Sequence, residues 1–481
     1  MTTHIEGRRR WLALIILCLG DLMIVLDSTI VNVALPSIRA DLGFTETSLV
    51  WVVNAYLLTF GGFLLLGGRL GDLYGHRRLF LAGIALFTLA SLGCGLADTQ
   101  GMLIAARAIQ GVAGAVVSSV ALSLIMLLFT EAEERARAMG VFGFVMAGGG
   151  SIGVLLGGLL TTLSWHWIFL VNLPVGILVF ALCIALLPAG ESQGTRGRLD
   201  VAGAVTVTLA LMLAVYAIVN GNEAGWTSVQ TLGLLAAAIL LLALFLLIES
   251  RVGAPLMPLG LFRLRNLATA NVAGVLWAAA MFAWFFLSAL YLQLVLGYSP
   301  MEVGLAFLPA NLIMGALSLG WSAKLVTRFG IRAPLACGLA VAAIGLALFA
   351  RAPADGTFLV DVLPGMVLLG FGAGIAFNPM LLAAMGDVAP GEAGLASGIV
   401  NTAFMMGGAL GLAILASAAA SRTGALAAAG AAMPVALNGG YHVAFMLGAA
   451  CALAAALLGG LLLRPGSQQA GGEPALAAEA E

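Results

Sequence analysis

Charged residues are scarce in this chain: Asp, Glu, Lys and Arg together make up 9% of its 481 residues, whereas 62% are hydrophobic. An ordinary soluble domain carries roughly 25% charged residues, so this composition excludes a water-soluble fold. Most apolar runs are about 18 to 25 residues long, the length that crosses about 30 Å of hydrocarbon as a helix. They lack the alternation of apolar and polar residues that barrel strands need. The sequence therefore predicts an all-helical protein embedded in a lipid bilayer.

Cysteine and histidine are also sparse, and neither is clustered. No CxxC spacing occurs, and the histidines stand apart at loops or helix ends, so neither a disulfide framework nor a zinc site is indicated. The residues concerned are Cys18, Cys94, Cys183, Cys337, Cys451, His4, His76, His166 and His442. We predict no metal, no cofactor and no nucleic-acid partner. No nucleophile, base and oxyanion set can be assembled from the spacing, so we do not expect an enzyme.

The apolar runs number fourteen, and the charges between them support that count. The runs lie near residues 12–33, 50–68, 79–97, 102–128, 137–161, 167–187, 201–220, 231–248, 268–292, 302–322, 334–350, 358–384, 393–419 and 442–463. An even number of crossings puts both termini on one side. With that side in the cytoplasm, 17 of the 21 Lys and Arg residues lie inside, three lie outside and Arg107 lies within a run. This positive-inside bias predicts cytoplasmic termini.

The first apolar run follows Arg8, Arg9 and Arg10, as the hydrophobic part of a signal peptide would. It is too long for that role, contains Asp21 and Asp27, and lacks a small-residue cleavage site. We therefore expect it to remain in the protein as the first membrane helix.

The chain contains an internal repeat. Residues 42–45 match residues 296–299 at an offset of 254, and residues 69–77 match residues 324–332 at an offset of 255. At an offset of 258, glycines match in four pairs: Gly140, Gly149, Gly150 and Gly153 with Gly398, Gly407, Gly408 and Gly411. Three matches at nearly one offset predict two homologous six-helix halves. Because an even number of helices separates them, the halves should share one orientation, with a site between them near the midplane.

The resulting division is six, two and six helices. We predict a cytoplasmic N-terminus (1–11), an N-terminal half (12–190), an inserted helix pair with its linkers (191–262), a C-terminal half (263–464) and a disordered tail (465–481). The tail is rich in Ala, Gly and Glu, a composition that does not support a packed core.

Four motifs carry a family resemblance. Residues 26–36, LDSTIVNVALP, resemble the helix 1 motif of the fourteen-helix drug:proton antiporters of the major facilitator superfamily, the EmrB/QacA type. Residues 68–78, GRLGDLYGHRR, are similar to the superfamily signature between helices 2 and 3. Arg107, Gln110 and Gly111 match its helix 4 motif, and residues 165–176, WHWIFLVNLPVG, resemble the start of helix 6. Four motifs in the right order, over nearly the whole chain, imply the major facilitator fold.

Three positions depart from the family pattern. The helix 5 antiporter motif usually carries a Gly-Pro pair, whereas Val154 follows Gly153 here. His166 stands where the family commonly has Arg, and Phe404-Met405 stands where helix 13 often has Arg-Gln. The first departure weakens the inference of proton antiport, and the other two bear on the substrate range.

Asp27 and Arg107 are charged residues inside apolar runs. At 1.5 Å per residue, Asp27 lies roughly 10 to 13 Å and Arg107 roughly 8 to 9 Å below the outer surface. An isolated charge there costs about 2.5–3.5 kcal/mol, so each needs a polar environment. We predict one polar cluster in which Asp27 exchanges a proton or accepts a cationic substrate. The alternative is a static pair that only holds helices 1 and 4 together.

Three further polar residues are assigned to the same region. By resemblance, Asn32 and Gln110 join the proton-coupling or substrate site. Asp21 lies about 120° around helix 1 from Asp27 and roughly 9 Å nearer the cytoplasm. It is either a second cation or proton site, or a protonated acid hydrogen-bonded to a neighbouring helix.

The segment between helices 2 and 3 is expected to be a cytoplasmic loop. By resemblance it acts as a gate latch, in which charged residues form a cluster that breaks and re-forms. The predicted gate residues are Gly68, Arg69, Asp72, Gly75, Arg77 and Arg78. Positive-inside topology alone is the alternative explanation.

Helix 5 is rich in glycine, which lets helices approach closely. We predict that four of these glycines pack at the interface between the halves: Gly149, Gly153, Gly157 and Gly158.

The function that these features favour is proton-coupled export of lipophilic, cationic or aromatic drugs by alternating access. The alternatives are a dedicated exporter of one antibiotic or metabolite and, from another class, a non-transporting membrane sensor or scaffold. The Arg, Ala and Gly bias hints at a GC-rich bacterial genome, so we expect a multi-pass protein of the bacterial inner membrane. We predict a monomer whose partners are small lipophilic substrates, protons and the lipid bilayer, with a periplasmic adaptor left open.

Overall fold

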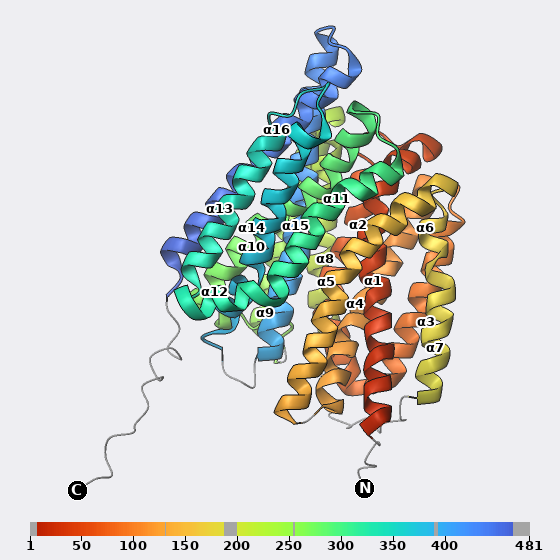
Figure 1. Cartoon of the computed structure of the whole chain (residues 1–481), viewed down its shortest axis with the longest axis vertical. Helices are drawn as coiled ribbons and strands as arrows, with labels where there is room; N and C mark the ends of the chain where they lie inside the picture. The colour runs from red at the N-terminus through yellow and green to blue at the C-terminus, as the bar shows by residue number, and fades with distance from the viewer. Residues whose placement is uncertain (1–6, 130, 187–199, 254, 389–392, 465–481) are drawn as a thin grey trace, which may run out of the picture.

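The computed structural model describes residues 7–129, 131–186, 200–253, 255–388 and 393–464; the predicted tail and part of the linker before the inserted pair lie outside these ranges. Within them the chain is helical and has no strand (Figure 1). The segments are α1 (Gly7–Leu42), α2 (Val50–Tyr74), α3 (His76–Gly95), α4 (Gln100–Leu128), α5 (Ala132–Leu163), α6 (Trp167–Leu170), α7 (Asn172–Leu186), α8 (Val201–Ala224), α9 (Val229–Arg251), η1 (Leu259–Arg263), α10 (Arg265–Leu290), η2 (Tyr291–Val295), α11 (Pro300–Ala316), η3 (Leu317–Trp321), α12 (Ser322–Phe329), α13 (Arg332–Phe349), η4 (Phe358–Val362), α14 (Leu363–Met385), α15 (Ala393–Ala428) and α16 (Met433–Leu462).

Thirteen helices in these ranges are long and apolar enough to cross a membrane. A further apolar helix, α11, has 17 residues and continues through η3 into α12. It corresponds to the predicted run at 302–322, so the structure agrees with fourteen crossings. The bundle end at which α1 begins and α16 ends is called the terminal end below, and the other is called the opposite end (Figure 1).

Two predicted boundaries were wrong. α1 continues through Pro36 to Leu42. A proline inside a helix removes one backbone hydrogen bond, and packing against the neighbouring helices compensates for that loss. The predicted loop at 68–78 is mostly helical: α2 runs to Tyr74, and α3 begins at His76. The chain reverses at Gly75 alone, whose φ of 91° is a conformation that favours glycine.

The internal repeat is visible in the backbone. Gly43 and Gly297, which match at an offset of 254, have φ angles of 69° and 74°. Gly75 and Gly330, at an offset of 255, have φ angles of 91° and 73°. By the same offsets, α2 corresponds to α11 and α5 to α15, and the structure packs α2 on α15 and α5 on α11. Across the contact between the halves, α2 therefore packs on the counterpart of α5, and α5 packs on the counterpart of α2.

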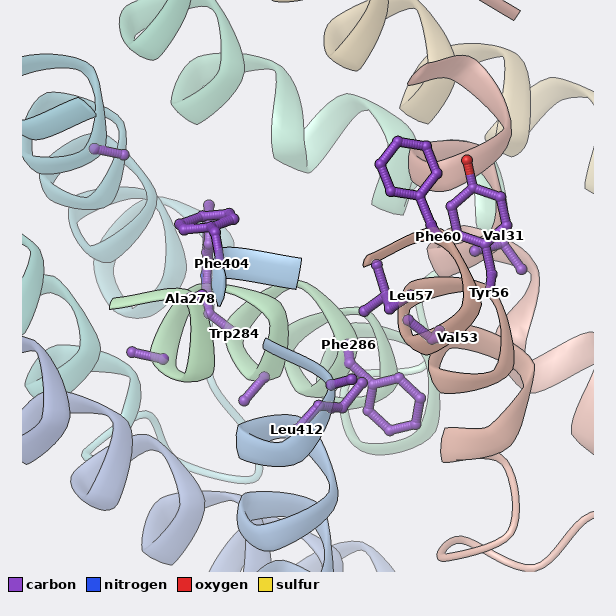
Figure 2. Close-up of a cluster of buried hydrophobic side chains, with 14 of the residues drawn as sticks. Val31, Val53, Tyr56, Leu57, Phe60, Ala278, Trp284, Phe286, Phe404 and Leu412 are labelled. Atoms are coloured by element: carbon purple, nitrogen blue, oxygen red, sulfur yellow. The ribbon is translucent and has the colours of Figure 1, made fainter. Parts of the chain in front are cut away.

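One buried apolar cluster runs across that contact (Figure 2). It includes Val53 and Leu57 on α2, Phe286 on α10 and Leu412 on α15. The pair α8 and α9 pack on each other, and α8 also packs on α2 and α15. The inserted pair thus lies beside the line along which the halves meet, while the exact domain boundaries remain predictions.

Candidate functional site

Asp27 on α1 and Arg107 on α4 form a buried ion pair. Arg107 Nη1 donates to Asp27 Oδ2, and the two side chains are 1% and 0% exposed. Arg107 Nε also donates to the carbonyl of Val52 on α2 at 3.0 Å. The pair therefore joins three helices, and its opposite charges neutralise each other in a site without solvent contact.

Three uncharged side chains complete the polar cluster. Gln110 Nε2 donates to Asp27 Oδ1 at 3.0 Å, and Asn172 Nδ2 on α7 donates to the same oxygen at 2.9 Å. Gln110 Oε1 accepts from Arg107 Nη1 at 2.9 Å, and Gln110 Nε2 donates to Ser91 Oγ on α3 at 2.7 Å. Both carboxylate oxygens of Asp27 are therefore held by donors.

Aromatic rings close the cluster. The guanidinium carbon of Arg107 lies 4.4 Å from the centre of the Tyr56 ring and 5.6 Å from that of Phe169. Such contacts stabilise a cation by about 0.5–2 kcal/mol. The Tyr56 hydroxyl is buried and has no hydrogen-bond partner among the described residues. The cation is thus held by rings as well as by its carboxylate.

The other two predicted members of the site make other contacts. Asp21 is fully buried six residues before Asp27 on α1, where Ser118 Oγ on α4 donates to Oδ1 at 2.5 Å. Its Oδ2 atom has no partner in the described part of the chain. Asn32 Nδ2 lies 3.4 Å from the carbonyls of Ser28 and Thr29 on its own helix. Asn32 is therefore not hydrogen-bonded to Asp27 in the described residues, and its place in the substrate site stays a prediction.

The predicted gate residues lie at the terminal end, where two of the arginines reach carbonyls of other segments. Arg69 Nη2 donates to Pro255 O at 2.9 Å, and Arg77 Nη2 donates to Ile184 O at 2.9 Å. Arg78 is exposed, and Gly68 is helical and only loosely packed. The side chain of Asp72 lies outside the described residues, so the predicted charge cluster remains a prediction.

The prediction for the helix 5 glycines was wrong in three cases of four. A Cβ added to Gly149 would meet Leu22 and Val25 of α1, and one added to Gly153 or Gly157 would also meet α1. These glycines pack within the N-terminal half because α1 lies directly along α5. Only Gly158 faces the other half: a Cβ there would lie 2.8 Å from the Pro300 carbonyl at the start of α11.

The C-terminal half contributes a group of aromatic rings on α10 and α11. Trp284 and Phe285 on α10 lie 4.4 Å apart between ring centres, and Phe285 stacks on Phe307 of α11 at 5.5 Å. Trp284 is 2% exposed, and its Nε1 atom lacks a partner within the described ranges. The two halves therefore contribute different chemistry, an ion pair on one side and an aromatic group on the other.

Sequence reasoning missed Asn172 and Ser91. Both residues are uncharged and of types that occur throughout helices, so nothing in the sequence indicated that they would be buried at the site. Asn172 lies within the motif WHWIFLVNLPVG, as its only amide side chain. The available clue was that Asn172 is an amide inside an apolar run, because a buried amide needs a hydrogen-bond partner.

Comparison with known proteins gives consistent matches. The model of the Major Facilitator Superfamily matches residues 17–412. The chain is similar to the puromycin resistance protein pur8 of Streptomyces alboniger, with 41% identity over 95% of this chain and 92% of that protein. It is 41% identical to the cephamycin export protein CmcT of Amycolatopsis lactamdurans, over 85% of each chain.

A multidrug resistance protein and a solved transporter structure are also similar to this chain. The multidrug resistance protein Stp of Mycobacterium tuberculosis is 38% identical over 86% of this chain and 77% of its own. A solved structure of an auto-inhibited peptide transporter of the POT family shares the fold, with a TM-score of 0.66 and 16% identity over 95% of this chain and 96% of that one.

Proposed function

The chain belongs to the Major Facilitator Superfamily, and on that premise we propose that it exports lipophilic, cationic or aromatic drugs in exchange for protons. It is a multi-pass membrane transporter and not an enzyme. Similarity to proteins named for puromycin resistance, cephamycin export and multidrug resistance supports drug export. Export of a single antibiotic is the second candidate, because two of these relatives are named for one compound each.

The observation that carries proton coupling is the enclosed ion pair of Asp27 and Arg107. When a proton binds Asp27, the carboxyl becomes neutral and Arg107 loses its counter-charge, although its bonds to Gln110 and Val52 remain. A buried cation that loses its counter-charge is costly, so protonation favours a rearrangement that admits water or substrate. Release of the proton restores the pair and the enclosed state. Competition between the proton and a cationic drug for Asp27 gives antiport.

Asp21 is proposed as a second proton site on the same path. It lies nearer the terminal end than Asp27 and carries one oxygen without a partner among the described residues. Ser118, which holds its other oxygen, is on α4, the helix that also carries Arg107 and Gln110. A proton leaving Asp27 toward the terminal end would meet Asp21 next. The remaining alternative is a permanently protonated acid that only links α1 to α4.

Contacts at the opposite end support alternating access. Gln293 Nε2 donates to Val33 O at 2.8 Å, and Asn54 Nδ2 donates to Ala409 O at 2.8 Å, both between the predicted halves. A Cβ on Gly304 of α11 would lie 2.9 Å from the Val154 carbonyl on α5. Toward the terminal end of α5, Gly140 has nothing within 4 Å of such a Cβ. These contacts correspond to a state that is closed at the opposite end.

We further propose that the protein lies in the bacterial inner membrane with its terminal end in the cytoplasm. The bias of 17 of 21 basic residues toward that side supports the orientation. In that orientation the closed end faces the periplasm. We expect the chain to work as a monomer, with its gate residues at the cytoplasmic surface; a periplasmic adaptor is a further proposal.

The test is drug transport in everted membrane vesicles from a host that lacks its own efflux pumps. We expect proton-driven uptake of a lipophilic cation, abolished by an uncoupler and reduced at least about a hundredfold in Asp27→Asn, because the variant cannot exchange a proton. Glu223→Gln, which changes an exposed acid on α8, is the matched control. Full coupled transport by Asp27→Asn at normal expression would refute the proton site.

A panel of compounds separates the two candidate functions. Uptake of several unrelated lipophilic cations supports multidrug export. Uptake of one antibiotic, without uptake of any other lipophilic cation in the panel, supports the dedicated exporter. Asp21→Asn, measured beside Asp27→Asn, distinguishes a second proton site from a structural acid: the former slows coupled uptake, and the latter leaves it unchanged.

A further inference from the structure

Two acids at the terminal end of the inserted helix pair are buried together. Asp200 caps α8 and Glu249 lies in the last turn of α9; the residues are 4% and 3% exposed. One oxygen of each has a backbone donor. Gly203 N donates to Asp200 Oδ1 at 2.7 Å, and Met257 N donates to Glu249 Oε2 at 3.0 Å.

The other two oxygens converge on each other. A Cβ added to Gly203 would lie 2.6 Å from Asp200 Oδ2 and 2.8 Å from Glu249 Oε1, so both oxygens lie over the same glycine and within hydrogen-bonding reach. Neither oxygen has another hydrogen-bond partner among the described residues. Two buried, unpartnered carboxyl oxygens directed at one point indicate that something bridges them.

A single proton is the bridge that fits. Two carboxylates in contact repel when both are ionised, whereas one proton between them makes a strong hydrogen bond and leaves a single charge. The described basic residues on the adjoining elements do not neutralise the pair. Arg69 on α2 is bonded to Pro255 O, and Arg251 on α9 is exposed. One proton held between the two facing oxygens would therefore be shared by both acids.

The same residues connect the acid pair to the gate. Glu249 holds the amide of Met257, and two residues earlier Pro255 accepts from Arg69. Between them, Leu256 packs in an apolar cluster with Leu66 of α2 and Ala204 of α8. Residues 255–257 are thus fixed on one side by the acid pair and on the other by the end of α2.

We propose that Asp200 and Glu249 bind one proton between them and that this proton keeps residues 255–257 docked against Arg69, as a pH-sensitive latch beside the gate. When the proton leaves, repulsion separates the ends of α8 and α9, and the segment 255–257 is released. The inserted helix pair therefore reports the pH at the terminal end to α2. The docking does not depend on drug transport, although its use as a gate control rests on the proposed function.

Hydrogen–deuterium exchange of the purified full chain tests the latch directly. Pro255 and Pro258 carry no amide hydrogen, so a peptide over 255–258 reports only Leu256 and Met257. If opening releases one proton, protection corrected for intrinsic exchange falls by up to about tenfold for each pH unit between the pH at which the separated acids ionise and the pH at which the docked pair loses its proton. We expect this fall in the wild type between about pH 5 and 9.

Two variants imitate the bridged state. In Glu249→Gln the amide can donate to Asp200 and its oxygen can still accept from Met257, and Asp200→Asn offers the reciprocal arrangement. Both should retain protection at every pH, while Glu223→Gln on α8 should keep the wild-type pH dependence. A wild type without pH dependence, or both bridging variants with the wild-type slope, would overturn the proposal. Drug uptake is measured separately, so failure of the export function leaves this result interpretable.

Discussion

At the scale of residues, the structure holds two opposite charges, Asp27 and Arg107, together inside an apolar bundle. Separating Asp27 from Arg107 by mutation would leave one uncompensated buried charge, which costs about 3–5 kcal/mol. In the intact protein, Gln110 and Asn172 donate hydrogen bonds to Asp27 Oδ1, and the Tyr56 ring lies over the Arg107 guanidinium. These contacts stabilise the two buried charges. The cluster thus satisfies both charges in the paired state, and we propose that protonation of Asp27 disturbs it.

Asn172→Ala tests whether the amide supports the carboxylate. The variant leaves Asp27 Oδ1 with Gln110 as its remaining described donor, so we expect a loss of about 1–3 kcal/mol in stability and roughly tenfold slower coupled transport. Thermal unfolding in detergent and vesicle uptake measure the two effects. Asn220→Ala is the control, since among the described residues Asn220 bonds to the Tyr216 carbonyl of its own helix. Equal effects of both variants would contradict a specific role for Asn172.

The sequence predicted the charged members of this site and, by resemblance, Gln110, but it did not predict Asn172 or Ser91. Asp27 and Arg107 stand out because any ionised group in an apolar run requires a partner. Asn172 and Ser91 carry no such penalty, and their contribution depends on how α3 and α7 are positioned, which is a matter of tertiary packing. Asn32 illustrates the converse, because a motif residue close to Asp27 in sequence turns its amide back to its own helix.

At the scale of elements, α5 shows two different uses of glycine along one helix. Its portion toward the opposite end packs against α1 and α11, where a Cβ on Gly157 would lie 2.8 Å from the Ile30 carbonyl. Gly148 and Gly150, which flank the packed Gly149 and point to other faces of the helix, have nothing within 4 Å of such a Cβ. Close approach by these glycines is therefore confined to the face of α5 that packs on α1 and α11.

Gly157→Ala and Gly150→Ala form a matched pair on this helix. The first forces a methyl group against a backbone oxygen that cannot move aside, so we expect destabilisation of about 1–3 kcal/mol. The second fills open space and removes the helix penalty of glycine, so we expect a gain of about 0.5–1 kcal/mol. Thermal unfolding of both variants in one detergent is sufficient. Similar shifts of both midpoints in the same direction would count against this division of α5.

Helix positions were predictable from apolar run length, but helix ends were not. α1 passes through Pro36 and α2 absorbs most of the expected 68–78 loop, because the surrounding helices supply packing that local sequence rules do not include. The same limit explains the glycine error. A glycine repeat predicts close approach, whereas the identity of the approached helix depends on how the whole bundle is assembled.

At the scale of the whole molecule, the two halves touch through both apolar and polar contacts, and we expect the polar ones to favour one conformation. An apolar interface between helices in lipid gains little from burial, since lipid is equally apolar. Hydrogen bonds between the halves, such as Asn54 to Ala409 and Gln293 to Val33, therefore carry a larger share of the preference for one state. Each is worth about 1 kcal/mol.

Glu46, in the turn between α1 and α2, adds a pH-dependent contact at the opposite end. Burial raises the pKa of Glu46, although Arg39 and the Tyr441 hydroxyl of α16 offset part of that rise. A folded-state pKa above the unfolded value means that the stabilisation is complete at low pH and is lost as pH rises through the folded pKa. We expect the unfolding midpoint to fall by about 2 °C between pH 5 and 8 in the wild type and to change less in Glu46→Gln. Parallel pH profiles for the two proteins would exclude Glu46 as the cause.

Removing the polar contacts between the halves should shift the conformational equilibrium. In Asn54→Ala/Gln293→Ala two hydrogen bonds of the closed opposite end are lost, so we expect its population relative to an open state to fall roughly five- to thirtyfold. Spin labels at exposed Gly101 and Leu359 report the separation by electron paramagnetic resonance, after Cys337 and Cys451 are replaced by alanine and with the other cysteines buried. Asn401→Ala, which removes a bond within α15, is the control. If the double variant and the control give the same distance distribution, these bonds do not select the state, and the apolar contact alone must do so.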